Sequence, residues 1–195
     1  MRPPPVHGSR SIVPGMHEFR SVDDLLTHLL ALSEMPSVEC DQFTELDHGL
    51  QSAALLREEH PGDLELQVAG LLHDLAHPWD GPGQPRHATM GADAVRGLLG
   101  TRVANLMQAH VPAKRYLVAT RPEYFALLSD DSVMTLAAQG GPMDAVEVAE
   151  FETDPDHMAM VALRIADDGA KVVGAKVTGL EFWVPIIQSV AAIHA

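Results

Sequence analysis

The residues best suited to chemistry are histidines and aspartates that fall within apolar helical patterns. His73 and Asp74 are adjacent in the segment 71–77 (Leu-Leu-His-Asp-Leu-Ala-His), at the end of an apolar run. Burying an imidazole and a carboxylate is costly unless the two are paired or bind a metal. An isolated pair of this kind is more often a hydrogen-bonded core pair, so the rest of the chain must decide between the two interpretations.

Four more potential ligands occur in comparable positions elsewhere in the chain. The complete set, in chain order, is His48, His73, Asp74, His87, His110 and Asp167. Four imidazoles and two carboxylates form a nitrogen and oxygen set that suits iron or manganese better than metals that prefer softer ligands. Asp74 has two oxygens and can bridge two ions while His73 binds one. The pattern predicts a two-metal centre, and a purely structural cluster is the weaker alternative.

Helix signals place these ligands on separate helices of an irregular all-α bundle. Ser21 is a candidate cap for a helix that ends before Pro36, Thr44 caps a helix over 45–59, and Asp63 opens a helix that stops at Pro78. Further helices are expected at 87–99, 101–110, 122–128, 129–138, 142–151, 156–167 and 180–193. We predict a loop at 79–86 and a short extended piece at 171–178.

Length and composition limit the class of protein. The chain has 195 residues, which we divide into a flexible N-terminal tail at 1–20 and a single metal-binding domain at 21–195. The formal net charge of −14 argues against nucleic acid and anionic membranes as partners. A single cysteine, Cys40, and the lack of a secretory or membrane-spanning pattern favour a cytoplasmic location.

Longer motifs around these ligands resemble the HD superfamily over about residues 36–182. Within it, the sequence is most similar to the HD-domain mixed-valent di-iron oxygenases that cleave organophosphonates, such as 2-amino-1-hydroxyethylphosphonate dioxygenase and its relative for the N-trimethyl substrate. The segments that carry the resemblance are 46–48 (Leu-Asp-His), 71–74 (Leu-Leu-His-Asp), 110–118 (His-Val-Pro-Ala-Lys-Arg-Tyr-Leu-Val), 136–144 (Leu-Ala-Ala-Gln-Gly-Gly-Pro-Met-Asp) and 164–167 (Arg-Ile-Ala-Asp).

The resemblance implies a division of the metal ligands between two iron ions. The first ion would be held by His48, His73, Asp74 and Asp167. Asp74 would bridge to the second ion, which His87 and His110 would also hold. The implied cofactor is an Fe(II)/Fe(III) pair with O2 as co-substrate, and His77 matches a histidine near that pair.

A second set of residues matches positions that surround the phosphonate group in the family. These residues are Lys114, Ser132, Thr135, Gln139 and Arg164. Ser132, Thr135 and Gln139 are spaced by three and four and so share one helical face, which on its own is more often a solvated stripe. Lys114 and Arg164 would supply the charge-assisted contacts that a doubly charged phosphonate needs. His77, Lys114 and Asp41 are the predicted catalytic residues.

Departures from the family pattern fall near the expected position of the substrate. Val38 stands where the family has a tyrosine ten residues before the first ligand. Asp41 stands where the family has a glutamate that meets the substrate amine, and the loop between Asp74 and His87 is shorter. If Asp41 faces the substrate, it would pair with a cationic amine. These changes affect substrate identity and leave the metal ligands intact.

The resemblance implies O2-dependent cleavage of the C–P bond of a small α-hydroxyphosphonate to a carboxylate and phosphate, with the amino or trimethylammonio type as substrate. Such an enzyme would act after an α-hydroxylating oxygenase in organophosphonate catabolism. The alternative is a metal-dependent HD phosphohydrolase acting on a small phosphate ester, since the same residues would bind phosphate. A protein that binds its ligand without catalysis is a third possibility.

Overall fold

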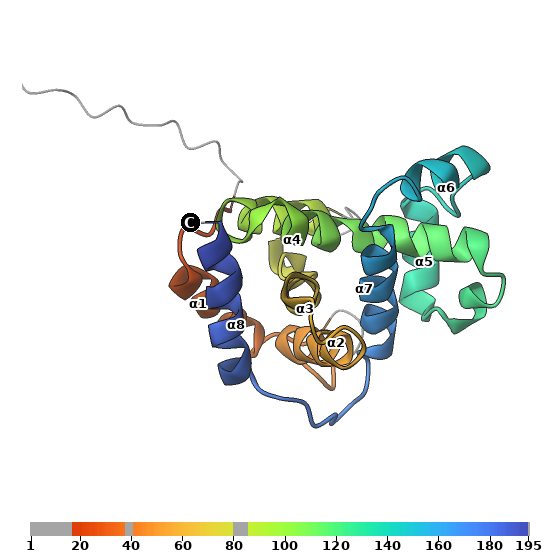
Figure 1. The fold of residues 1–195 in the computed structure, drawn as a ribbon. Coiled ribbons are helices and arrows are strands. Elements are labelled where there is room, and N and C mark those ends of the chain that lie inside the picture. The colour runs from red at the N-terminus through yellow and green to blue at the C-terminus, as the bar shows by residue number, and fades with distance from the viewer. Residues whose placement is uncertain (1–16, 38–40, 80–85, 195) are drawn as a thin grey trace, which may run out of the picture.

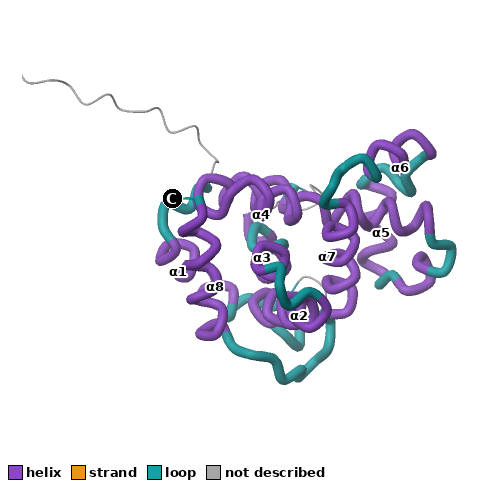
Figure 2. Tube along the Cα trace, viewed as in Figure 1, coloured by secondary structure: helices purple, strands orange, loops and turns teal. Residues whose placement is uncertain are grey.

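The computed structural model describes residues 17–37, 41–79 and 86–194, and within these ranges it is all-helical (Figures 1 and 2). The elements are α1 (Val22–Leu32), α2 (Glu45–Glu59), α3 (Leu64–Leu72), η1 (His77–Trp79), α4 (His87–Thr120), η2 (Tyr124–Leu127), α5 (Asp130–Ala138), α6 (Ala145–Phe151), α7 (His157–Gly169) and α8 (Leu180–Ile193). The predicted all-α class is confirmed.

Local capping explains where several helices begin. Thr44 and Asp47 form a reciprocal capping box at the start of α2. Asp63 caps α3 by accepting from the Leu66 amide, and Ser129 caps α5 by accepting from the Ser132 amide. The caps predicted at Thr44 and Asp63 are therefore confirmed, and each of these helices carries residues of the candidate site.

Helix α4 departs most from the sequence-based expectation. The predicted boundary near residue 100 is a kink at Gly100, whose φ of 86° is the left-handed conformation that glycine adopts without strain. The predicted end at residue 110 is wrong, because the helix continues through Pro112 to Thr120. Proline removes one helical hydrogen bond, but the turns beyond it bury Ala113 and Leu117 completely, and this packing outweighs the loss.

The bundle is organised around α3, whose residues 66–72 are all buried. Helices α2, α4, α7 and α8 pack around it, and Figure 1 shows α3 in the middle of this ring. Helices α5 and α6 project at the side of α7 that faces away from α8 (Figure 1). The central position of α3 places its C-terminal end, where His73 and Asp74 follow, inside the molecule.

Other expectations fare differently. The segment 122–128 contains the short 3-10 helix η2 instead of an α-helix, and 171–178 contains one turn at 173–174 and no strand. Most of the predicted tail and of the loop at 79–86 lies outside the described residues. Near the chain start, the Phe19 amide donates to the Ala94 carbonyl of α4 at 2.9 Å. No helix in the described ranges combines the length and apolar character that crossing a bilayer requires.

Candidate metal centre

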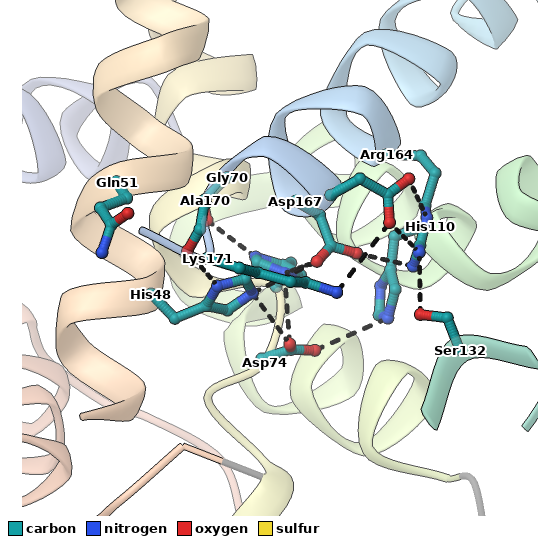
Figure 3. A network of polar contacts seen from close by, with 12 residues as sticks. His48, Gln51, Gly70, Asp74, His110, Ser132, Arg164, Asp167, Ala170 and Lys171 are labelled. Atoms are coloured by element: carbon teal, nitrogen blue, oxygen red, sulfur yellow. Dashed lines mark hydrogen bonds and ion pairs between the residues drawn. The ribbon is translucent and has the colours of Figure 1, made fainter. Parts of the chain in front are cut away.

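Four of the predicted ligands converge from α2, the end of α3 and α7. One ligand atom from each of His48, His73, Asp74 and Asp167 lies within 4.8 Å of the others. His48 Nε2 is 3.3 Å from Asp167 Oδ1, and His73 Nε2 is 3.2 Å from Asp74 Oδ2. Two nitrogens and two carboxylates at this spacing form a compact site for one ion, and Figure 3 shows the side chains from these elements meeting.

A second group of ligand atoms faces the other oxygen of Asp74. Oδ1 of Asp74 is 3.5 Å from His77 Nε2 and 3.6 Å from the Nε2 atoms of both His87 and His110. The Nε2 atoms of His87 and His110 are 3.2 Å apart, so both rings point at the same space. Asp74 therefore presents one oxygen to each group, which is the arrangement that a bridging carboxylate requires.

Backbone carbonyls fix the orientation of three imidazoles. Nδ1 of His48 donates to the Ala170 carbonyl at 3.0 Å, Nδ1 of His73 to the Gly70 carbonyl at 2.8 Å, and Nδ1 of His110 to the Met107 carbonyl at 2.6 Å. A carbonyl only accepts, so the Nδ1 atoms must carry the hydrogens. When these rings are neutral, their Nε2 lone pairs point inward, as metal-binding histidines require.

Several of these inward atoms have no hydrogen-bond partner among the described residues. They are His48 Nε2, His73 Nε2 and Asp74 Oδ1, and all three are buried. Buried polar atoms are almost always satisfied, and leaving them unsatisfied is costly. A pair of metal ions would satisfy these atoms, and the mixed nitrogen and oxygen donor set suits iron. The residues present therefore fit the implied cofactor.

Charge compensation within the cluster is strong. Burial raises the pKa of the Asp74 and Asp167 carboxyl groups. The positive charge of His73 beside Asp74, and of Arg164 beside Asp167, outweighs burial and holds the pKa of each carboxyl well below its usual range. Burial alone would lower the pKa of His48, yet Asp167 and Asp74 raise it to about 9. Burial lowers the pKa of His110 to about 3, so His110 is neutral and keeps a lone pair for a metal.

Glu45 is a site residue that the sequence analysis missed. This carboxylate is buried at the first position of α2, and its Oε2 lies 3.1 Å from His77 Nδ1. An acidic residue in the first turn of a helix is ordinary, because it complements the helix dipole. Only the position of His77 beside Asp74 shows that Glu45 belongs to the site, where it orients the His77 ring.

Hydrogen bonds join four of the five predicted phosphonate-binding residues, and one of the four, Arg164, contacts the metal cluster. Lys114 is buried one helical turn after His110, and its Nζ donates to Thr135 Oγ1 at 2.9 Å and to the Ser132 carbonyl at 3.3 Å. Arg164 is also buried and donates to Ser132 Oγ at 3.3 Å. Gln139 ends α5, and its buried Oε1 has no partner within the described ranges.

Arg164 also contacts the metal cluster. Its Nη1 donates to Asp167 Oδ2 at 2.7 Å, on the oxygen opposite to the one that faces His48 and His73 (Figure 3). Its Nε and Nη2 contact Asp168, which the sequence analysis also missed. Asp41 is exposed in the turn before α2, and Val38 lies outside the described residues. The roles assigned to all of these residues stay predictions.

Comparison with known proteins places the chain in a family. No protein-family model matches it. It is 35% identical over 77% of its length to a [1-hydroxy-2-(trimethylamino)ethyl]phosphonate dioxygenase of Leisingera caerulea, covering 81% of that protein. It is 37% identical over 76% of its length to a hydroxymethylphosphonate dioxygenase of Gimesia maris, covering 78% of it. Since these matches span most of this chain and most of each relative, the chain belongs to the HD-domain phosphonate dioxygenases.

Proposed function

We propose that this protein catalyses the O2-dependent cleavage of the C–P bond in a small α-hydroxyphosphonate and releases a carboxylate and phosphate. The observation that carries the proposal is the contact between two sites. A cluster of four histidines and two aspartates with unsatisfied inward atoms contacts one buried cation, Arg164, through Asp167, and a second buried cation, Lys114, lies one helical turn after His110. Both relatives are named as phosphonate dioxygenases, which supports this reaction.

The proposed cofactor is a pair of iron ions. His48, His73, Asp74 and Asp167 would hold one ion, and Asp74, His87 and His110 would hold the other. When bound, the irons supply the redox chemistry by which O2 removes four electrons from the substrate. Fe(II)/Fe(III) is the proposed resting pair, because this mixed-valent state is the one that the resemblance to the family implies.

The phosphonate would bind to the cations beside the cluster. Lys114 and Arg164 provide ammonium and guanidinium donors, and Ser132 and Thr135 contribute hydroxyl groups from α5. Charge-assisted hydrogen bonds in a buried site are roughly twice as strong as neutral ones. In a chain with a net charge of −14, two buried cations that both contact Ser132 favour an anionic ligand at this place. Gln139, at the end of α5, would complete the set.

His77 would contact the reacting end of the substrate. Its Nδ1 faces Glu45, so its Nε2 is directed towards the space between Asp74 and His87. This orientation allows His77 Nε2 to hydrogen-bond a substrate hydroxyl next to the metal cluster. Glu45 keeps the ring in place while the substrate enters and leaves.

The substrate class follows from what the relatives' substrates share. One relative is named for a trimethylamino compound and the other for hydroxymethylphosphonate, and both compounds carry a hydroxyl on the carbon bonded to phosphorus. We propose an α-hydroxyphosphonate of this size, with Asp41 meeting any cationic amine. We also propose that an oxygenase that hydroxylates this carbon supplies the substrate.

The test is phosphate release by anaerobically prepared iron protein, with and without O2, from hydroxymethylphosphonate and from [1-hydroxy-2-(trimethylamino)ethyl]phosphonate. We expect release only with O2, about two irons per chain, and an electron paramagnetic resonance signal of a coupled Fe(II)/Fe(III) pair that changes when phosphonate is added. The variant Asp41→Ala should impair the cationic substrate more than the neutral one. Phosphate-ester hydrolysis with manganese or magnesium, indifferent to O2, would contradict the proposal in favour of a hydrolase.

A further inference from the structure

Arg164 joins the metal cluster to the phosphonate pocket through one guanidinium group. Its Nη1 donates to Asp167 Oδ2 at 2.7 Å, and its Nη2 donates to Ser132 Oγ at 3.3 Å. Asp167 is a proposed metal ligand and Ser132 a proposed phosphonate contact. A rotation of this planar group would therefore disturb both sites at once.

The remaining edge of the guanidinium is held by a tyrosine and a second aspartate. Nε of Arg164 donates to the Tyr124 hydroxyl at 3.0 Å and approaches Asp168 Oδ2 at 3.1 Å, and Nη2 contacts Asp168 Oδ1. The Tyr124 hydroxyl in turn donates to Asp168 Oδ2. Arg164, Tyr124 and Asp168 therefore form a closed triangle of hydrogen bonds on the side away from Asp167.

The position of the Tyr124 hydroxyl is fixed independently of the site. Tyr124 lies in η2, and its buried ring packs against Leu117 of α4 and Val161 of α7 in a small apolar cluster, against which the Tyr116 ring also packs. The ring needs no polar contact to stay in place, so the hydroxyl reaches Arg164 and Asp168 from a rigid support. Removal of the hydroxyl alone would leave this packing intact.

We propose that Tyr124 is a positioning residue for phosphonate binding. Its hydroxyl holds Asp168 and the guanidinium of Arg164 in fixed positions relative to each other. The inference rests on the proposed function, since it requires that Arg164 meets the phosphonate. Without the hydroxyl, Asp168 loses a donor and Arg164 loses an acceptor. The guanidinium is then free to turn towards Asp168, and its Nη2 moves away from the pocket.

The chain contains a matched control for this contact. It has only two tyrosines, and the other, Tyr116, also donates from its hydroxyl to a carboxylate, Glu152 Oε1 at 2.9 Å. Its ring stacks on Phe151, at a centroid distance of 4.8 Å. Tyr116 thus loses the same kind of hydrogen bond on replacement by phenylalanine, but its partner is exposed and Arg164 is not involved.

The experiment compares wild type, Tyr124→Phe and Tyr116→Phe as iron-loaded proteins. Calorimetry under anaerobic conditions measures the Kd for hydroxymethylphosphonate, and steady-state assays in air measure kcat and KM. For Tyr124→Phe we expect Kd and KM to rise about tenfold, as for a weakened bond to a charged group, with kcat and iron content within about twofold of wild type. Tyr116→Phe should leave all four quantities unchanged.

The outcomes separate this inference from the proposed function. If Tyr124→Phe lowers only the melting temperature and leaves Kd and KM unchanged, the hydroxyl is merely structural and the inference is wrong. If both tyrosine variants raise Kd equally, the effect is not specific to Arg164 and the inference is also wrong. Wild-type iron protein that binds no phosphonate would overturn the proposed function, and the inference would fall with it.

Discussion

Two arginines of this protein each gather several carboxylates, and they do so in different surroundings. Arg102 of α4 contacts Asp63 at the start of α3, Glu65 in the first turn of α3, and Asp156 just before α7. Arg164 of α7 contacts Asp167 and Asp168 of its own helix. The side chain of Arg102 is 30% exposed, whereas that of Arg164 is only 5% exposed.

The difference shows how burial changes the role of the same kind of ion pair. The Arg102 cluster ties the starts of α3 and α7 to the middle of α4 near the surface, where solvent screens each pair and the net gain is small. The Arg164 cluster costs desolvation free energy on folding, so stability alone is a weak reason for its presence. Its neighbours are proposed metal ligands and phosphonate contacts, which indicates that its role is in the site.

Replacing Arg164 with methionine should have the largest effect. Asp167 and Asp168 would lose their buried counter-ion, so we expect the free energy of unfolding to fall by about 3 kcal/mol. The phosphonate would lose a charged donor, and kcat/KM should fall about 100-fold or more. Urea unfolding and steady-state kinetics of the iron-loaded variant measure both quantities. Normal phosphonate turnover by Arg164→Met would show that the proposed anion pocket is wrong.

Replacing Arg102 with methionine should separate stability from activity. Losing the partly exposed ion pairs of Arg102 should lower the free energy of unfolding by about 1 kcal/mol. For a chain of this length that corresponds to a decrease in melting temperature of about 2–4 °C. We expect kcat/KM to stay within about twofold of wild type. A loss of activity comparable to that of Arg164→Met would mean that the two clusters do not differ in role.

The smallest expected effect is the pH dependence of the Arg102 cluster. Hydrogen bonds from Arg102 lower the pKa of Asp63 below its usual value. A lowered pKa in the folded state stabilises the protein fully above the unfolded-state pKa of about 4. This contribution is lost as the pH falls through the folded-state value. The difference in unfolding free energy between wild type and Arg102→Met should therefore shrink on acidification below about pH 4, as urea titrations would measure. An undiminished difference would exclude Asp63 as its source.

Much of the fold follows from local sequence signals. The caps at Thr44 and Asp63 and the helices over 45–59 and 180–193 were predicted from side chains that act within one or two turns. The continuity of α4 through Pro112 was not, because it depends on packing between helices far apart in the chain. Proline is a strong local signal for a helix end, and tertiary burial overrides it here.

The candidate site also contains residues that the sequence identifies and residues that it does not. His48, His73, Asp74 and Asp167 were identifiable because charged and imidazole groups stand out in apolar helical patterns. Tyr124 was not identifiable, since it lies in a short irregular helix without periodicity. Asp168 directly follows Asp167, and that doubled acid was the one available signal for it. The contacts that orient Arg164 come from three separate elements and appear only when these are folded together.

The part of α4 beyond the kink at Gly100 bears on the size of the molecules that this protein can act on. His110 and Lys114 lie four residues apart on this part of α4, so the backbone positions of the proposed metal ligand and the proposed anion contact are separated by about one 5.4 Å turn. This fixed spacing suits a compound whose oxidised carbon is bonded directly to phosphorus. A compound with a longer spacer between these two atoms would place its hydroxyl out of register with the metals. We therefore expect selectivity for α-hydroxyphosphonates, set by the backbone spacing of these two residues.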